Sequence, residues 1–193
     1  MNHWIWKDDL QTENQASLGT RPALIRDRDL RFDDGILMDP LALGAPLDIT
    51  LSHEDDGYLT DNLVAPGFPG LLISARLRTV FEKSGVDNIQ YFPINLLTST
   101  GTAPIHQYFI ANIVGKVGCI DIDRSDITMT AGPPTIIDAI DHLVLHEHKI
   151  QNLNIFRLGE IPVVIFINSR IRDAVEKSRA SGVSFYPIDE FVF

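Results

Sequence analysis

Three histidines in the C-terminal part of the chain have the side chains best suited to metal chemistry. His142, His146 and His148 follow Asp138, and imidazole is a common ligand of Zn²⁺ and other transition metals. In a strand over residues 138–146 they would share one face, but same-face side chains point in parallel about 6.5 to 7 Å apart. One hypothesis from the sequence is therefore a metal-binding protein or metal-dependent enzyme. The alternative is a polar strand end that binds no ligand.

Acidic residues form two further candidate sites. Asp121, Asp123 and Asp126 alternate as in a calcium loop, but the glycine at the sixth position and the distal glutamate are missing. We expect a solvated turn or an acidic surface that contacts a partner. The densest acidic run is Glu54, Asp55 and Asp56, which we also consider as partner contacts.

The motifs of common enzymes are absent from the sequence. It contains no GxGxxG, GxxxxGK[ST], GxSxG or HExxH pattern. Cys119 is the only cysteine, so an internal disulfide and a thiolate zinc cluster are excluded. We therefore expect a protein that is not an enzyme and that carries no cofactor.

Charge and hydropathy restrict the partners. Asp and Glu number 26 against 16 Lys and Arg, a formal net charge of −10 that repels nucleic-acid phosphates and attracts a basic protein. The first residues lack a basic stretch followed by an apolar one, and no apolar run approaches the roughly 20 residues of a membrane span. We expect a cytoplasmic protein that binds neither nucleic acid nor membrane.

The strongest organisational signal is a helix-then-strand unit written twice. Residues 73–94 align with residues 167–188 without a gap across 22 positions. Eight pairs are identical: Ile73 and Ile167, Arg76 and Arg170, Arg78 and Arg172, Glu82 and Glu176, Lys83 and Lys177, Ser84 and Ser178, Pro93 and Pro187, and Ile94 and Ile188.

Each copy of the unit has the residues that a capped, amphipathic helix needs. Ser74 and Asn168 are suited to accept hydrogen bonds from the first free N–H groups of a helix. Apolar residues then recur at helical spacing, and the shared proline is predicted to end or to edge each strand that follows.

Other strands are predicted from alternating or continuous apolar runs. They cover residues 3–7, where Trp4 and Trp6 share a face, one stretch near 47–51, two stretches within 105–122, and the segments 138–146, 154–158 and 162–167. Residues 39–70 are otherwise rich in proline and glycine, which indicates turns. The predicted fold is a mixed α/β (α+β) single domain over residues 1–193, with a mixed β-sheet, a less regular part over 1–69 and the duplicated unit within 70–193.

Several of these segments resemble a family of bacterial polymorphic-toxin immunity proteins. The resemblance covers roughly residues 70–190 and rests on the segments Gly70–Leu77, Ile89–Ile94, Tyr108–Ile113, Cys119–Ser125, Ile155–Leu158, Asn168–Arg170 and Gly182–Pro187. These are packing motifs and include no catalytic residue.

The resemblance implies a non-catalytic cytoplasmic protein that binds and neutralises a cognate toxin encoded by an adjacent gene. Such toxins serve in competition between bacteria. The family pattern brings no fixed toxin-binding positions, so the acidic candidates stay a hypothesis from the residues alone. A scaffold or regulatory module without a toxin partner is the third alternative.

Overall fold

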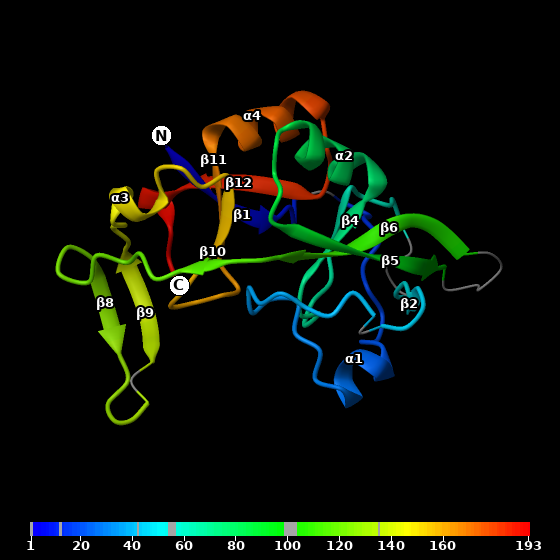
Figure 1. Cartoon of the computed structure of the whole chain (residues 1–193), viewed down its shortest axis with the longest axis horizontal. Coiled ribbons are helices and arrows are strands. Elements are labelled where there is room, and N and C mark those ends of the chain that lie inside the picture. Colours follow the sequence, from blue (N-terminus) through cyan, green and yellow to red (C-terminus); the bar gives the residue numbers. More distant parts are fainter. Residues whose placement is uncertain (1, 12, 42, 54–56, 99–103, 135) are drawn as a thin grey trace.

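The computed structural model describes residues 2–11, 13–41, 43–53, 57–98, 104–134 and 136–193, and it confirms a mixed α/β fold (Figure 1). The strands are β1 (His3–Asp8), β2 (Leu47–Thr50), β3 (Asn62–Leu63), β4 (Leu71–Ser74), β5 (Ile89–Leu97), β6 (Pro104–Ile113), β7 (Lys116–Val117), β8 (Asp126–Met129), β9 (Ile137–His142), β10 (Ile155–Leu158), β11 (Ile165–Asn168) and β12 (Val183–Pro187). The helices are α1 (Ala23–Asp27), α2 (Ala75–Lys83), α3 (Glu147–Ile150), α4 (Ser169–Ser178) and the 3₁₀ turn η1 (Ile188–Glu190).

The strands form two five-stranded sheets and one separate hairpin. One sheet has the order β12-β1-β11-β10-β7 and the other the order β2-β5-β6-β4-β3, while β8 pairs with β9. Both large sheets contain parallel and antiparallel pairs, as a mixed sheet requires. The hairpin projects from the body at the left of Figure 1.

The duplicated unit extends beyond the segments that align in sequence. In the sheet that contains the first helix-then-strand unit, β6 lies between β4 and β5 and is antiparallel to both. In the sheet that contains the second unit, the N-terminal strand β1 has the equivalent place between β11 and β12. We call β3, β4, α2, β5 and β6 copy 1, and β10, β11, α4, β12 and β1 copy 2.

The pairing register of the two copies is the same. Ser74 faces Tyr108 and Pro93 faces Phe109 in copy 1. At the equivalent positions of copy 2, Asn168 faces His3 and Pro187 faces Trp4. Tyr108 therefore corresponds to His3, and Phe109 corresponds to Trp4.

Side-chain contacts repeat along with the backbone. Arg76 donates to the Asp61 carboxylate over 2.8 Å, and its counterpart Arg170 donates to the Asn154 side-chain oxygen over 2.8 Å. Asp61 and Asn154 occupy the same position, one residue before β3 and β10 in register. The identical arginines thus have a structural role in both copies.

A second identical arginine stacks on aromatic rings. The Arg78 guanidinium lies 4.8 Å from the ring centres of Tyr91 and Phe109, and that of Arg172 lies 4.0 Å from Trp4. Such contacts combine cation–π attraction with burial of the arginine stem.

Both repeated helices begin as predicted. The Ser74 hydroxyl accepts from the Leu77 N–H over 3.1 Å, and the Asn168 side-chain oxygen accepts from the Ile171 N–H over 3.0 Å. Leu77 and Phe81 in α2, like their counterparts in α4, are buried. The two helices lie side by side at the top of Figure 1.

Three clusters of buried apolar residues hold the layers together. One packs residues 16–51 against copy 1, and a second packs residues 119–150 against copy 2. The third draws residues from both copies: Trp6, Ile73, Leu77, Phe81, Val86, Ala111, Ile113, Ile155, Ile165, Ile167, Ile171 and Val175. This shared cluster joins the two sheets beneath α2 and α4.

One buried cation also connects distant segments. Arg157 in β10 is 1% exposed and donates to the carbonyl oxygens of Pro162 and Phe32, over 2.8 and 3.0 Å. Burial lowers the pKa of Arg157 to about 10, although the negative charges of Asp33 and Asp34 act to raise it. The bond to Phe32 fixes the N-terminal loop on copy 2.

Pro93 does not end β5, which continues to Leu97, but it lies on an edge, the other predicted alternative: β2 pairs with β5 only from Ile94 onward, so the proline is outside the stretch that has a second partner. The strand predicted over 138–146 ends at His142. Within the described ranges, no helix has the length and apolar character that a bilayer span requires.

Candidate functional site

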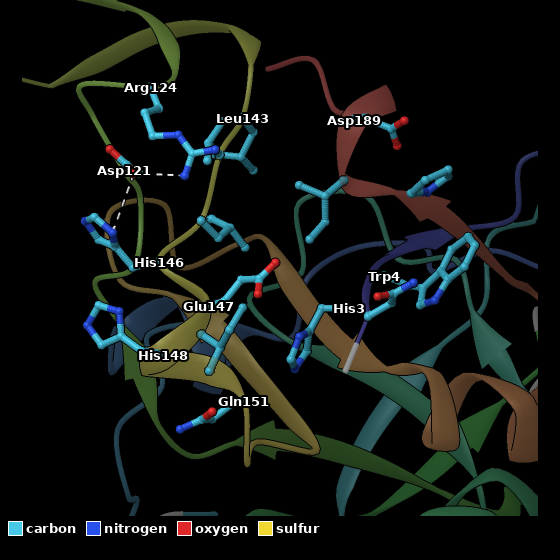
Figure 2. A pocket seen from close by; sticks show the side chains of 16 residues that line it. His3, Trp4, Asp121, Arg124, Leu143, His146, Glu147, His148, Gln151 and Asp189 are labelled. Carbon is cyan, nitrogen blue, oxygen red and sulfur yellow. Dashed lines mark ion pairs between the residues drawn. The ribbon is translucent and has the colours of Figure 1, made fainter.

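A cleft of about 740 Å³ lies at the end of copy 2 (Figure 2). Its lining comes from the start of β1, the turn after Ile120, residues 143–151 and the chain that follows β12. The lining residues are Asn2, His3, Trp4, Asp121, Arg124, Leu143, Val144, Leu145, His146, Glu147, His148, Ile150, Gln151, Pro187, Ile188 and Asp189. This volume falls in the range of about 300 to 1,000 Å³ that is usual for ligand sites.

The cleft lies at the end where the strands of copy 2 are shorter than those of copy 1. β5 and β6 have 9 and 10 residues, whereas β12 and β1 have 5 and 6. In copy 1 the extra length carries Ile94 into the core, and β2 pairs alongside it. In copy 2 the equivalent Ile188 begins η1 and lines the cleft instead.

The turn that carries Asp121 is held by its own backbone. The Asp121 carbonyl accepts from the Ser125 N–H over 2.9 Å and from the Ser125 hydroxyl over 2.7 Å. The Asp121 N–H donates to the Val144 carbonyl over 2.8 Å, and the Val144 N–H donates to the Ser125 hydroxyl over 2.9 Å. The carboxylate is therefore fixed at the mouth of the cleft and is not on a free loop.

The electrostatics of the cleft favour a positively charged group. The Asp121 carboxylate has a side-chain exposure of 13% and lies 3.7 Å from both the Arg124 guanidinium and His146 Nδ1, too far for a hydrogen bond. Glu147 and Asp189 add two carboxylates, whereas Arg124 is the single permanent cation among the described lining residues. Figure 2 shows both ion pairs of Asp121 as dashed lines.

The predicted row of three histidines does not form. His142 ends β9, His146 precedes α3 and His148 lies within it, because the backbone turns after the strand. The His146 and His148 rings lie 5.6 Å apart in the cleft, whereas His142 is not part of the lining. Over the ranges described, no three His, Cys, Asp or Glu side chains are placed to hold a metal ion.

The acidic candidates have different positions. Asp121 lines the cleft, whereas Asp123 is exposed on the same turn and Asp126 is exposed at the start of β8. Glu54, Asp55 and Asp56 lie outside the described residues.

The lining offers little to nucleophilic catalysis. Among the described residues of the cleft there is no serine, threonine or cysteine beside His146. Cys119 lies behind the turn, fully buried, and burial raises the pKa of its thiol to about 12. A neutral buried thiol is a packing group rather than a nucleophile.

Among the residues that line the cleft, sequence reasoning identified Asp121, His146 and His148 as candidates but not Trp4, Glu147 or Asp189. Trp4, which the predicted strand over residues 3–7 places on one face with Trp6, is only half-buried, and its indole N–H donates to the Ser169 hydroxyl over 3.3 Å. Glu147 and Asp189 carried no motif. Their only signal was position, since each lies directly beyond a predicted strand.

The comparison with protein families decides the affiliation of the chain. The model of the immunity protein family Imm11 matches residues 1–190. The chain belongs to this family. The Imm11 match includes the first 69 residues, whereas the resemblance in sequence covers only roughly residues 70–190. The wider match agrees with the place of β1 inside copy 2. A search of the curated proteins found no match.

Proposed function

We propose that this Imm11 protein neutralises a cognate toxin by binding it directly, without catalysis. The observation that carries the proposal is the family match over residues 1–190. The net charge of −10 supports a basic toxin, because opposite charge speeds the encounter of two proteins. The toxin would serve in competition between bacteria, and the immunity protein would act in the cytoplasm of the cell that produces this toxin.

We propose further that the toxin contacts the unrepeated segment 119–151. This segment supplies Asp121 and most of the cleft, together with the exposed Asp123 and Asp126. The repeated helices α2 and α4 instead bury their apolar faces in the shared core. Glu54, Asp55 and Asp56 remain predicted contacts from the sequence.

The test is co-expression with the toxin domain of the adjacent gene. We expect the wild-type chain to restore growth and to form a complex with the catalytically inactivated toxin domain in size-exclusion chromatography. Failure of both would reject the proposal.

A pair of charge reversals tests the contact surface. Asp123→Lys changes an exposed carboxylate of the unrepeated segment, and Asp87→Lys changes an exposed carboxylate of the repeated unit. We expect the first to slow association and the second to leave it unchanged. Equal association rates would contradict the assignment of the surface.

A further inference from the structure

The β8–β9 hairpin has an open edge. The described residues place no strand beside the outer edge of β8, whereas β9 is paired on both sides, with β8 and with the C-terminal Phe193. An unpaired edge offers a row of N–H and C=O groups to another strand.

The pairing pattern identifies which groups face outward. The N–H and C=O of Ile140 both bond to Phe193, over 3.0 and 3.1 Å, so they point away from its opposite residue Ile127. Ile127 therefore turns its own backbone groups to the open side. Because the Thr130 N–H bonds inward to the Ile136 carbonyl over 2.9 Å, alternation also turns the Met129 N–H outward.

Exposed apolar side chains lie on the hairpin and in the turn before it. Met129 is 38% exposed, Ile136 is 57% exposed and Ile122 in the preceding turn is 56% exposed. Methionine adapts its shape to a partner surface, and exposed apolar groups rimmed by charge are typical of interfaces.

The charge of the segment limits the kind of occupant. Residues 119–146 contain Asp121, Asp123, Asp126, Asp138 and Asp141 against the single cation Arg124. Two copies of this edge would bring like charges together, which opposes self-association. A basic strand is complementary.

We infer that the outer edge of β8 adds to a sheet of the toxin, by pairing with an edge strand of a basic toxin domain. This inference rests on the proposed function. The backbone groups of Ile127 and Met129 supply the hydrogen bonds, Met129 and Ile136 supply apolar contact, and the aspartates orient the basic partner.

Two variants at one position separate backbone pairing from side-chain contact. Met129→Ala removes only the side chain, whereas Met129→Pro also removes the outward N–H, at an edge position that tolerates proline. With the purified inactive toxin domain of the adjacent gene, we expect Kd to rise about tenfold for the first and about a hundredfold for the second.

Hydrogen exchange supplies a measurement that needs no variant. The amides of Ile127 and Met129 should exchange rapidly in the free chain and slowly in the complex. Equal Kd for the two variants together with unchanged exchange would overturn strand addition, while a wild-type chain that still binds would leave the proposed function intact. A dimer of the free chain that is lost on Met129→Pro would also overturn the inference, because a second copy would then occupy the edge. A wild-type chain that binds no toxin would overturn both.

Discussion

Copy 1 and copy 2 share strand order and register but obtain their central strand from different parts of the chain. In copy 1 the central strand β6 follows β5 directly, whereas in copy 2 it is β1, from the opposite end of the sequence. Copy 1 is covered by β2 at the end where copy 2 is open. The comparison indicates that the two copies share backbone pairing while their side chains and coverings differ, and that the cleft lies at the end of copy 2 that no strand of the described residues covers.

The largest difference in side-chain volume is at the centre of the shared core. Trp6 in copy 2 corresponds to Ala111 in copy 1, and the indole packs against Phe81 and Phe185 with ring centres 5.7 and 5.6 Å away. We expect Trp6→Ala to lower the free energy of unfolding by about 3 to 5 kcal/mol, measured by urea denaturation.

The control for this cavity keeps an aromatic ring. Among the residues that the structure describes, the Trp6 indole N–H has no hydrogen-bond partner, so Trp6→Phe breaks no bond and should cost less than about 1.5 kcal/mol. Equal losses for Trp6→Ala and Trp6→Phe would show that the indole does not fill the core as described.

The loops that follow the two repeated helices each contain a glycine with positive φ, and the two glycines differ in the space around them. Gly182 has φ +81°, and an added Cβ would lie 2.1 Å from the Asn62 carbonyl oxygen. We expect Gly182→Ala to cost roughly 2 to 3 kcal/mol, because the neighbouring backbone must move. Gly85 has φ +72°, but an added Cβ would meet the Arg170 guanidinium at an ordinary contact distance of 3.9 Å, so Gly85→Ala should cost only about 1 kcal/mol by the same measurement. A larger loss at Gly85 would contradict this contrast.

A backbone carbonyl oxygen at equivalent positions of the two copies is contacted by a different side chain in each copy. The Tyr108 hydroxyl donates to the Thr60 carbonyl over 2.7 Å, and at the equivalent place His3 Nε2 lies 3.2 Å from the Leu153 carbonyl oxygen. We expect Tyr108→Phe to cost about 1 kcal/mol at neutral pH in urea denaturation. The exposed Tyr58 is the matched control, and Tyr58→Phe should change nothing.

The same variant has a pH signature. Burial raises the pKa of Tyr108 to about 12, above its ordinary value of 10, so the fold favours the protonated phenol. Its contribution is present below about pH 10 and is lost as pH rises toward 12. The alkaline loss of stability should therefore be smaller in Tyr108→Phe, and an unchanged pH profile would argue against the burial effect.

The smallest expected effect is a gain. Arg179 ends α4 with φ +56° at the position that Gly85 occupies after α2. A left-handed conformation strains any residue with a Cβ, so Arg179→Gly should raise the free energy of unfolding by about 0.5 to 1 kcal/mol in thermal and urea denaturation. Destabilisation would mean that the Arg179 side chain has a role that outweighs the strain.

The sequence allowed prediction of those parts of the fold that are local. Helix caps at Ser74 and Asn168 and the apolar stripes follow from neighbouring residues, so both repeated helices were found. The equivalence of β1 and β6 was out of reach, because Trp4 and Phe109 correspond only through pairing with strands far away in the chain. Long-range register is set by tertiary packing, which no short pattern records.

The site was predictable to a smaller degree. Asp121 was identified because its acidic pattern is contiguous, but the cleft also needs Trp4 and Asp189 from opposite ends of the chain. The histidine row was wrong because strand periodicity was continued past His142, where the backbone turns toward α3.

The central place of β1 has a consequence for biosynthesis. The strands of copy 1 are consecutive in the chain, so we expect them to pair once residue 113 has left the ribosome. The β1 strand, with its two tryptophans, precedes all of them yet cannot be flanked on both sides until β12 has been made. We expect a nascent chain in which one half is folded while the earliest segment still needs protection from premature pairing.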